Sequence, residues 1–113
     1  MIPSYNEFYR PMLDAIADGG VHTLKELYVT LADYFGLTEA ERRQLQPEGR
    51  QILYKNRICW AKMYLDRAGL LMTPRRGAVV ITAEGKRVQR DEKIPLDNDY
   101  LMRYESFREF KNK

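Results

Sequence analysis

Apolar residues recur at helical spacing through the first two thirds of the chain. This pattern predicts helices over residues 4–18, 23–35, 38–46 and 50–68. Pro11 disturbs the first of them, because a proline inside a helix loses a hydrogen bond and clashes with the preceding turn. That helix therefore either starts near Pro11 or bends there.

Residues that favour helix ends support these boundaries. Ser4, Thr23 and Thr38 each precede a glutamate by three residues, which is the spacing of a capping box at a helix start. Gly36 and Gly69 follow the second and fourth helices, where glycine adopts the left-handed stop conformation without strain.

The period of the pattern changes after Gly69. Residues 70–72 and the β-branched run 78–81 indicate two short strands, joined by a turn over residues 73–77. A last short helix begins at Thr82. Helices followed by a two-stranded hairpin predict a mainly α fold with a small β-hairpin, in the winged variant of the helix-turn-helix.

The length of 113 residues suits one ordinary domain. We expect a winged-helix domain over residues 1–90, because the composition shifts at Arg90 to a charged stretch with Pro95, which is typical of a linker. Within residues 91–113, apolar residues three apart predict a short amphipathic helix with one apolar face: Leu101, Tyr104, Phe107 and Phe110.

Charge is uneven along the chain, although the net charge is only +3. Residues 1–41 carry two basic side chains against seven acidic ones, whereas residues 42–76 carry nine basic side chains against two acidic ones. Such a basic block predicts one positive face, which attracts polyanions such as nucleic acid. A solvated basic surface without a ligand is the alternative interpretation.

The chain lacks the residues that several functional classes need. The single histidine and single cysteine, His22 and Cys59, are far apart, so we expect no metal and no cofactor. Glu-x-Lys pairs at Glu84 and Glu109 match a spacing used by metal-dependent nucleases, but both fall on predicted helices, so we expect no catalytic residues. One cysteine predicts a reducing, cytoplasmic setting, and no apolar run reaches the ~18 residues of a membrane span.

Candidate DNA-binding residues cluster on the third and fourth predicted helices and at the hairpin tip. A helix in the major groove presents its first turns to base edges, where arginine pairs with guanine, and glutamine or asparagine with adenine. Basic residues at the hairpin tip would reach phosphate or a minor groove. The residues expected to contact DNA are Arg42, Arg43, Arg50, Gln51, Tyr54, Lys55, Asn56, Arg57, Lys62, Arg75 and Arg76.

Two aromatic or basic positions on the fourth helix have a competing structural interpretation. Arg57 lies near the buried side of the helical wheel, where it would pair with an acid of the first two helices. Trp60 has the ring to stack on a flipped base, but we expect it to pack at the edge of the core.

Two stretches together resemble the N-terminal domain of the Mrr family of restriction endonucleases: GRQILYKNRICWAKMYLDRAGLL over residues 49–71 and TPRRGAVVITAEGKRV over residues 73–88. The resemblance implies a winged helix that binds double-stranded DNA, which is methylated for several members. It also implies a parent protein with a separate C-terminal nuclease domain, towards which residues 91–113 would lead. On this interpretation the chain is not an enzyme on its own.

A second hypothesis is an interaction module, because winged helices also serve as dimerisation or docking surfaces. The acidic first third would meet a basic partner, and the apolar face within residues 91–113 would bury against another chain, which makes a homodimer the alternative assembly. An enzyme in its own right is the weakest of the three hypotheses, since it depends on Glu109 or Glu84 in short, common sequence matches.

Overall fold

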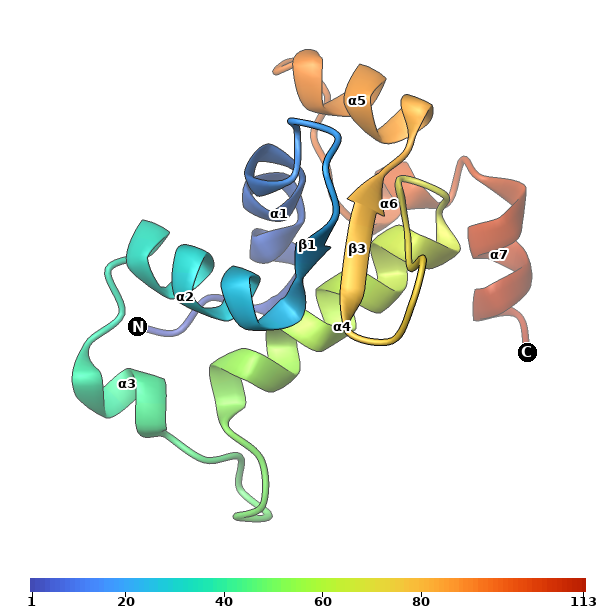
Figure 1. The fold of residues 1–113 in the computed structure, drawn as a ribbon. Helices are drawn as coiled ribbons and strands as arrows, with labels where there is room; N and C mark the ends of the chain where they lie inside the picture. Colours follow the sequence, from blue (N-terminus) through green and yellow to red (C-terminus); the bar gives the residue numbers. More distant parts are fainter.

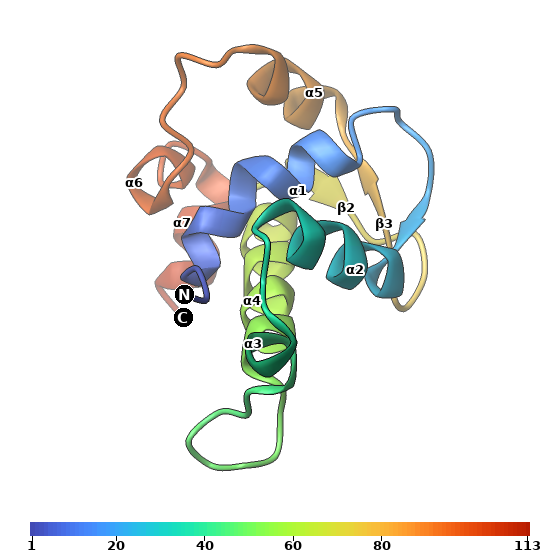
Figure 2. The same ribbon diagram turned by 90° about the vertical axis from the view of Figure 1, so that its left-hand side faces the viewer.

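Helices supply most of the architecture, and three short strands complete it (Figures 1 and 2). The computed structural model describes residues 1–113. In chain order the elements are the 3₁₀ helix η1 (Tyr5–Phe8), α1 (Tyr9–Ala15), β1 (His22–Thr23), α2 (Leu24–Tyr34), α3 (Glu39–Arg43), α4 (Leu53–Arg67), β2 (Leu71–Met72), β3 (Ala78–Ile81), α5 (Ala83–Arg90), α6 (Asn98–Leu101) and α7 (Glu105–Lys111). The fold is mainly α with a small antiparallel sheet.

The first helical segment is divided around Pro11. The 3₁₀ helix η1 gives way to α1 just before this residue, so Pro11 lies in the first turn of α1, where a missing N–H is tolerated. The segment starts as expected, with the Ser4 amide donating to the Glu7 carboxylate at 2.6 Å. α1 stops at Ala15, whereas the sequence pattern predicts a helix to residue 18.

The sheet has three strands, whereas the sequence pattern predicts only a two-stranded hairpin. Both strand pairs are antiparallel and the order is β1-β3-β2, with His22 opposite Val79 and Leu71 opposite Ile81. β1 has two residues, too few to show an alternating pattern. Thr23 belongs to this strand and also caps α2 through its hydroxyl, so the cap is the only signal that the sequence shows.

The expected third and fourth helices are both longer than those observed, and residues 44–52 between them form a loop. An antiparallel bridge between Leu45 and Ile52 closes this loop, and the Gln46 amide donates to the Gln51 carbonyl at 2.8 Å. The backbone therefore pairs across the loop instead of extending α4 back to residue 50. In both ribbon views the loop projects beyond the helices (Figures 1 and 2).

One apolar core connects the elements of the fold, and the C-terminal segment is part of it. Leu101 and Phe107 are fully buried in the same cluster as α1, α2, α4 and the sheet. The largest fully buried side chains are Tyr9, Phe8, Phe107, Met12, Leu13, Ile16, Leu27, Leu31, Ile58, Leu65, Leu70 and Leu71. The segment 91–113 therefore packs on the core that residues 1–90 build.

Arg10 of α1 fastens the beginning of this C-terminal segment. Its guanidinium donates to four main-chain carbonyls at 2.9–3.3 Å, those of Val88, Gln89, Asp91 and Ile94. The end of α5 and the chain after it are thus held against α1. None of the helices combines the length and the apolar character needed to cross a membrane.

Candidate nucleic-acid interface

α4 presents one side to the core and another to solvent. The core side consists of residues with at most 5% exposure: Tyr54, Ile58, Ala61 and Leu65. The solvent side carries residues that follow one another at helical spacing: Lys55, Asn56, Cys59, Lys62 and Met63. Because Tyr54 is buried, it has no free surface for DNA, and we leave it out of the interface proposed below.

Two adjoining hollows follow the solvent side of α4. One, of about 470 Å³, is lined by the start of α4, the loop before it and α2: Tyr28, Arg50, Gln51, Ile52, Lys55, Asn56 and Cys59. The other, of about 420 Å³, continues towards the end of the helix: Leu24, Cys59, Lys62, Met63, Asp66 and Arg67. Cys59 lines both hollows, so Arg50, Lys55 and Lys62 belong to one continuous surface.

The Lys55 side chain lines the first hollow and contacts an aromatic ring of α2. Its ammonium nitrogen lies 5.2 Å from the centre of the Tyr28 ring, a cation–π arrangement. The Tyr28 hydroxyl lies 3.1 Å from the sulfur of Cys59. Burial raises the pKa of Tyr28 above its ordinary value, which already keeps this hydroxyl protonated at neutral pH. The positive charge of Lys55 therefore has a defined place beside α4.

The hairpin of β2 and β3 brings two more cations to the same region. Arg75 and Arg76 are exposed in its turn. The turn is tied to α4, since the Thr73 hydroxyl donates to the Asp66 carboxylate at 2.8 Å. Asp66 itself lines the second hollow, so the hairpin lies next to it. The sequence pattern does not predict the hydrogen bond between Thr73 and Asp66, because a bond between a helix and a hairpin leaves no local periodicity.

The two arginines of the third helix that were expected to contact DNA differ. The side chain of Arg42 forms hydrogen bonds within the protein, whereas that of Arg43 forms none. Arg42 donates from Nη2 to the Asp33 carboxylate at 3.0 Å and from Nε to the Leu37 carbonyl at 2.9 Å. Its guanidinium thus fastens α3 to the end of α2. Arg43 is exposed next to the 44–52 loop.

Arg57 and Trp60 lie on the flank of α4 that faces the N-terminal segment. Arg57 donates from Nη1 to the carbonyls of Ile2 and Pro3 at 3.1 and 2.9 Å. Its partners are main-chain carbonyls rather than the acid that the sequence led us to expect. Trp60 packs edge-on against Tyr64, with ring centres 6.1 Å apart, and keeps 45% of its surface exposed.

The first of the two Glu-x-Lys pairs has a structural role. Arg87 donates to both carboxylate oxygens of Glu84, at 2.8 and 2.7 Å, and the Tyr104 hydroxyl donates to the same group at 2.6 Å. These bonds lower the pKa of Glu84 to about 2, with Arg87 the larger cause and Tyr104 the next. Glu84 therefore fastens the C-terminal segment to α5.

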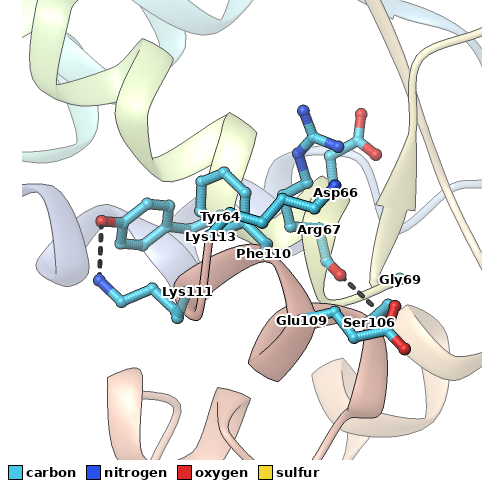
Figure 3. A pocket seen from close by; sticks show the side chains of 9 residues that line it. All are labelled: Tyr64, Asp66, Arg67, Gly69, Ser106, Glu109, Phe110, Lys111 and Lys113. Carbon is cyan, nitrogen blue, oxygen red and sulfur yellow. Dashed lines mark hydrogen bonds between the residues drawn. The ribbon is translucent and has the colours of Figure 1, made fainter.

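The second pair borders a larger hollow, of about 870 Å³, between the C-terminal half of α4 and α7 (Figure 3). Arg67 lies over the ring of Phe110, 5.1 Å from its centre, and Lys111 donates to the Tyr64 hydroxyl at 3.3 Å. Glu109 lines this hollow from a helix. No group of three or more histidine, cysteine or carboxylate side chains is placed to hold a metal ion.

The fold and this surface define a class of protein: a small, mainly α domain with a three-stranded sheet and basic side chains along its longest helix. The sequence model of the Mrr N-terminal domain family matches residues 5–91, and the chain belongs to this family. The Type IV methyl-directed restriction enzyme EcoKMrr of Escherichia coli (strain K12) is 33% identical over 87 residues. That match covers 74% of this chain and 28% of the relative. No solved structure matches the chain.

Proposed function

We propose that this domain binds double-stranded DNA as a winged helix, with the first turns of α4 in the major groove and the β2–β3 hairpin as the wing. The observation that carries the proposal is the bond between Thr73 and Asp66, which ties the turn of the hairpin to the last turns of α4. An α-helix with its side chains is about as wide as the major groove, so α4 fits there.

Base edges and phosphates would be contacted by different parts of this surface. The α4 side chains that would face the major groove are those of Lys55, Asn56 and Lys62, which lie on the solvent side of the helix. Arg75 and Arg76 would meet the DNA backbone or a minor groove on one side of the helix. Arg43 and Arg50 would meet phosphates on the other side.

Membership of the Mrr N-terminal domain family supports a targeting role in a larger protein. On this proposal the domain delivers a separate nuclease domain to its DNA target. One relative is a methyl-directed restriction enzyme, so we include methylated duplexes among the proposed substrates.

Binding to duplexes of one sequence in three forms tests the proposal: unmodified, with 5-methylcytosine and with N6-methyladenine. We expect the 113-residue chain to bind all three at about 50 mM salt, to bind a methylated form more tightly, and to lose affinity steeply as salt rises. Fluorescence anisotropy of labelled duplexes gives each dissociation constant. Absence of duplex binding at low salt would refute the proposal.

The alternative of an interaction module loses one of the two features that suggested it, the apolar face within residues 91–113. Leu101 and Phe107 are fully buried in the chain's own core. Tyr104 and Phe110 are partly buried against the same core. The apolar face of the C-terminal segment is therefore already covered within one copy of the chain.

A further inference from the structure

We infer that Asn56 recognises adenine in the major groove, and that Gln51 and Gln46 are positioning residues that orient its amide. The inference rests on the proposed function, because it concerns the base contacts of the same surface. The three side chains carry the same amide group, but one contacts the base and the other two hold that side chain in place.

The three side-chain amides form one cluster, which we call the carboxamide cluster: Gln46, Gln51 and Asn56. The Gln51 oxygen Oε1 accepts from Asn56 Nδ2 at 2.6 Å and from Gln46 Nε2 at 3.1 Å. The backbone supports this arrangement, since the Gln46 amide donates to the Gln51 carbonyl at 2.8 Å. The 44–52 loop is therefore folded in a way that brings the Gln51 side chain to the first turns of α4.

The hydrogen-bonding capacity left on each amide excludes Gln51 as the residue that reads a base. An amide oxygen has two lone pairs, and two donors already occupy the oxygen of Gln51. Adenine presents an acceptor at N7 and a donor at N6 in the major groove, so its reader must offer both a donor and an acceptor. Gln51 keeps only N–H donors, whereas Asn56 and Gln46 each keep an oxygen and one N–H. Of these two, only Asn56 lines the hollow beside α4.

The location of Asn56 agrees with this assignment. It lies in the first two turns of α4 and lines the same open hollow as Arg50, Lys55 and Cys59. A side chain that is already held by a hydrogen bond loses less rotational freedom when it binds a base. Gln51 therefore prepares Asn56 for the contact, at the place where cations hold the DNA backbone.

Selection from a pool of randomised DNA duplexes tests the inference with the full chain and its variants. The wild-type protein is expected to enrich sequences with adenine at one position, and Asn56→Ala to lose that preference. Gln51→Ala, and more weakly Gln46→Ala, are expected to reduce it. Gln51→Glu retains two acceptor oxygens, so it is expected to keep the adenine preference although its negative charge weakens overall binding.

Replacing the selected adenine by 7-deazaadenine removes the N7 acceptor and leaves the rest of the duplex unchanged. We expect this replacement to weaken binding of the wild-type protein by about tenfold, and to leave the affinity of Asn56→Ala unchanged. An adenine preference that persists in Asn56→Ala, or a wild-type selection without adenine, would overturn the inference while duplex binding stands. Loss of duplex binding altogether would overturn the proposed function, and the inference with it.

Discussion

Gly85 of α5 lies so close to the backbone of Leu70 that a Cβ atom on it would stand 1.9 Å from the Leu70 carbonyl oxygen. The same Cβ would lie 2.8 Å from a side-chain carbon of Ile81. Because the nearest atom belongs to the main chain, it cannot turn away as the end of a flexible side chain would. The absence of a side chain at Gly85 therefore sets how closely α5 approaches the sheet.

We expect Gly85→Ala to lower the free energy of unfolding by about 3 kcal/mol, since an extra methyl group here forces the backbone apart. The effect opposes the better helix propensity of alanine. Urea unfolding followed by circular dichroism measures it. Gly20→Ala is the control, because its Cβ would meet only the Asp18 carboxylate at 3.4 Å. Equal stability of the two variants would contradict the packing described.

Removing both hairpin arginines tests their proposed contact with phosphate. In the double variant Arg75→Ala, Arg76→Ala, the slope of log affinity against log salt is expected to become shallower by about 1.8, at ~0.9 per phosphate contact. The matched control removes two exposed cations at the end of α5 and after it, in Arg90→Ala, Lys93→Ala. Identical slopes for the hairpin variant and the wild type would refute the role of the wing.

The bond between Thr73 and Asp66 predicts that the hairpin can be loosened without unfolding the domain. Thr73→Val keeps the shape of the side chain and removes the hydroxyl, at a cost of about 1 kcal/mol in stability. Affinity for duplex DNA is expected to fall several-fold, because the turn that carries Arg75 and Arg76 loses its bond to α4. Thr73→Ser keeps the donor and should behave like the wild type. Full affinity in Thr73→Val would show that the bond does not position the wing.

His22 predicts a fall in stability towards alkaline pH. Its ring lies 2.8 Å from the Asp18 carboxylate and 3.3 Å from that of Glu26. The hydrogen bond to Asp18 raises the pKa of His22 most, and the bond to Glu26 adds to it, against a partial burial that lowers it. The folded protein thus holds this proton more tightly than the unfolded chain does.

The stabilisation from His22 is present below the unfolded pKa of about 6.5 and is lost as the pH rises through the raised folded value. The free energy of unfolding of the wild type is therefore expected to decrease as the pH rises above about 6.5. His22→Gln should show a flatter profile in the same denaturation series. Parallel profiles would mean that the two carboxylates do not stabilise the charged ring.

Glu84 predicts the opposite dependence, at acidic pH. Its pKa is lowered to about 2 by Arg87 and Tyr104. Its contribution to stability is therefore present above the unfolded pKa of about 4.5 and is lost as the pH falls towards 2. Glu84→Gln should be less stable than the wild type at neutral pH, and the difference should shrink under acid. Glu105→Gln, which alters an exposed glutamate of α7, is the control.

Local physical chemistry accounts for the parts of the fold that the sequence predicts. Thr38 begins α3 as the capping spacing indicates, with its amide donating to the Glu41 carboxylate at 2.8 Å. The helical period places Ile58 and Leu65 in the core and Lys55 on the solvent side of α4. These features depend on residues within one or two turns of each other, so the pattern of a single segment contains them.

Features made by distant segments leave no such pattern. The pairing of His22 with Val79, which creates β1, joins residues far apart in the sequence. The site shows the same limit, because Arg57 occupies the expected region of α4 and yet donates to the Ile2 carbonyl. Gln46 belongs to the carboxamide cluster only because its loop folds back. Composition identifies the basic region, and tertiary contacts decide which of its side chains remain free.

The bridge from Arg10 to the carbonyls of residues 88–94 has a consequence for where the chain can be shortened. A fragment cut at residue 91 would contain the whole region that matches the family. It would also lose Leu101 and Phe107, which are fully buried in the core, and would remove the Ile94 carbonyl, which accepts from the Arg10 guanidinium at 2.9 Å. The core of the folded protein therefore extends beyond the stretch that matches the family.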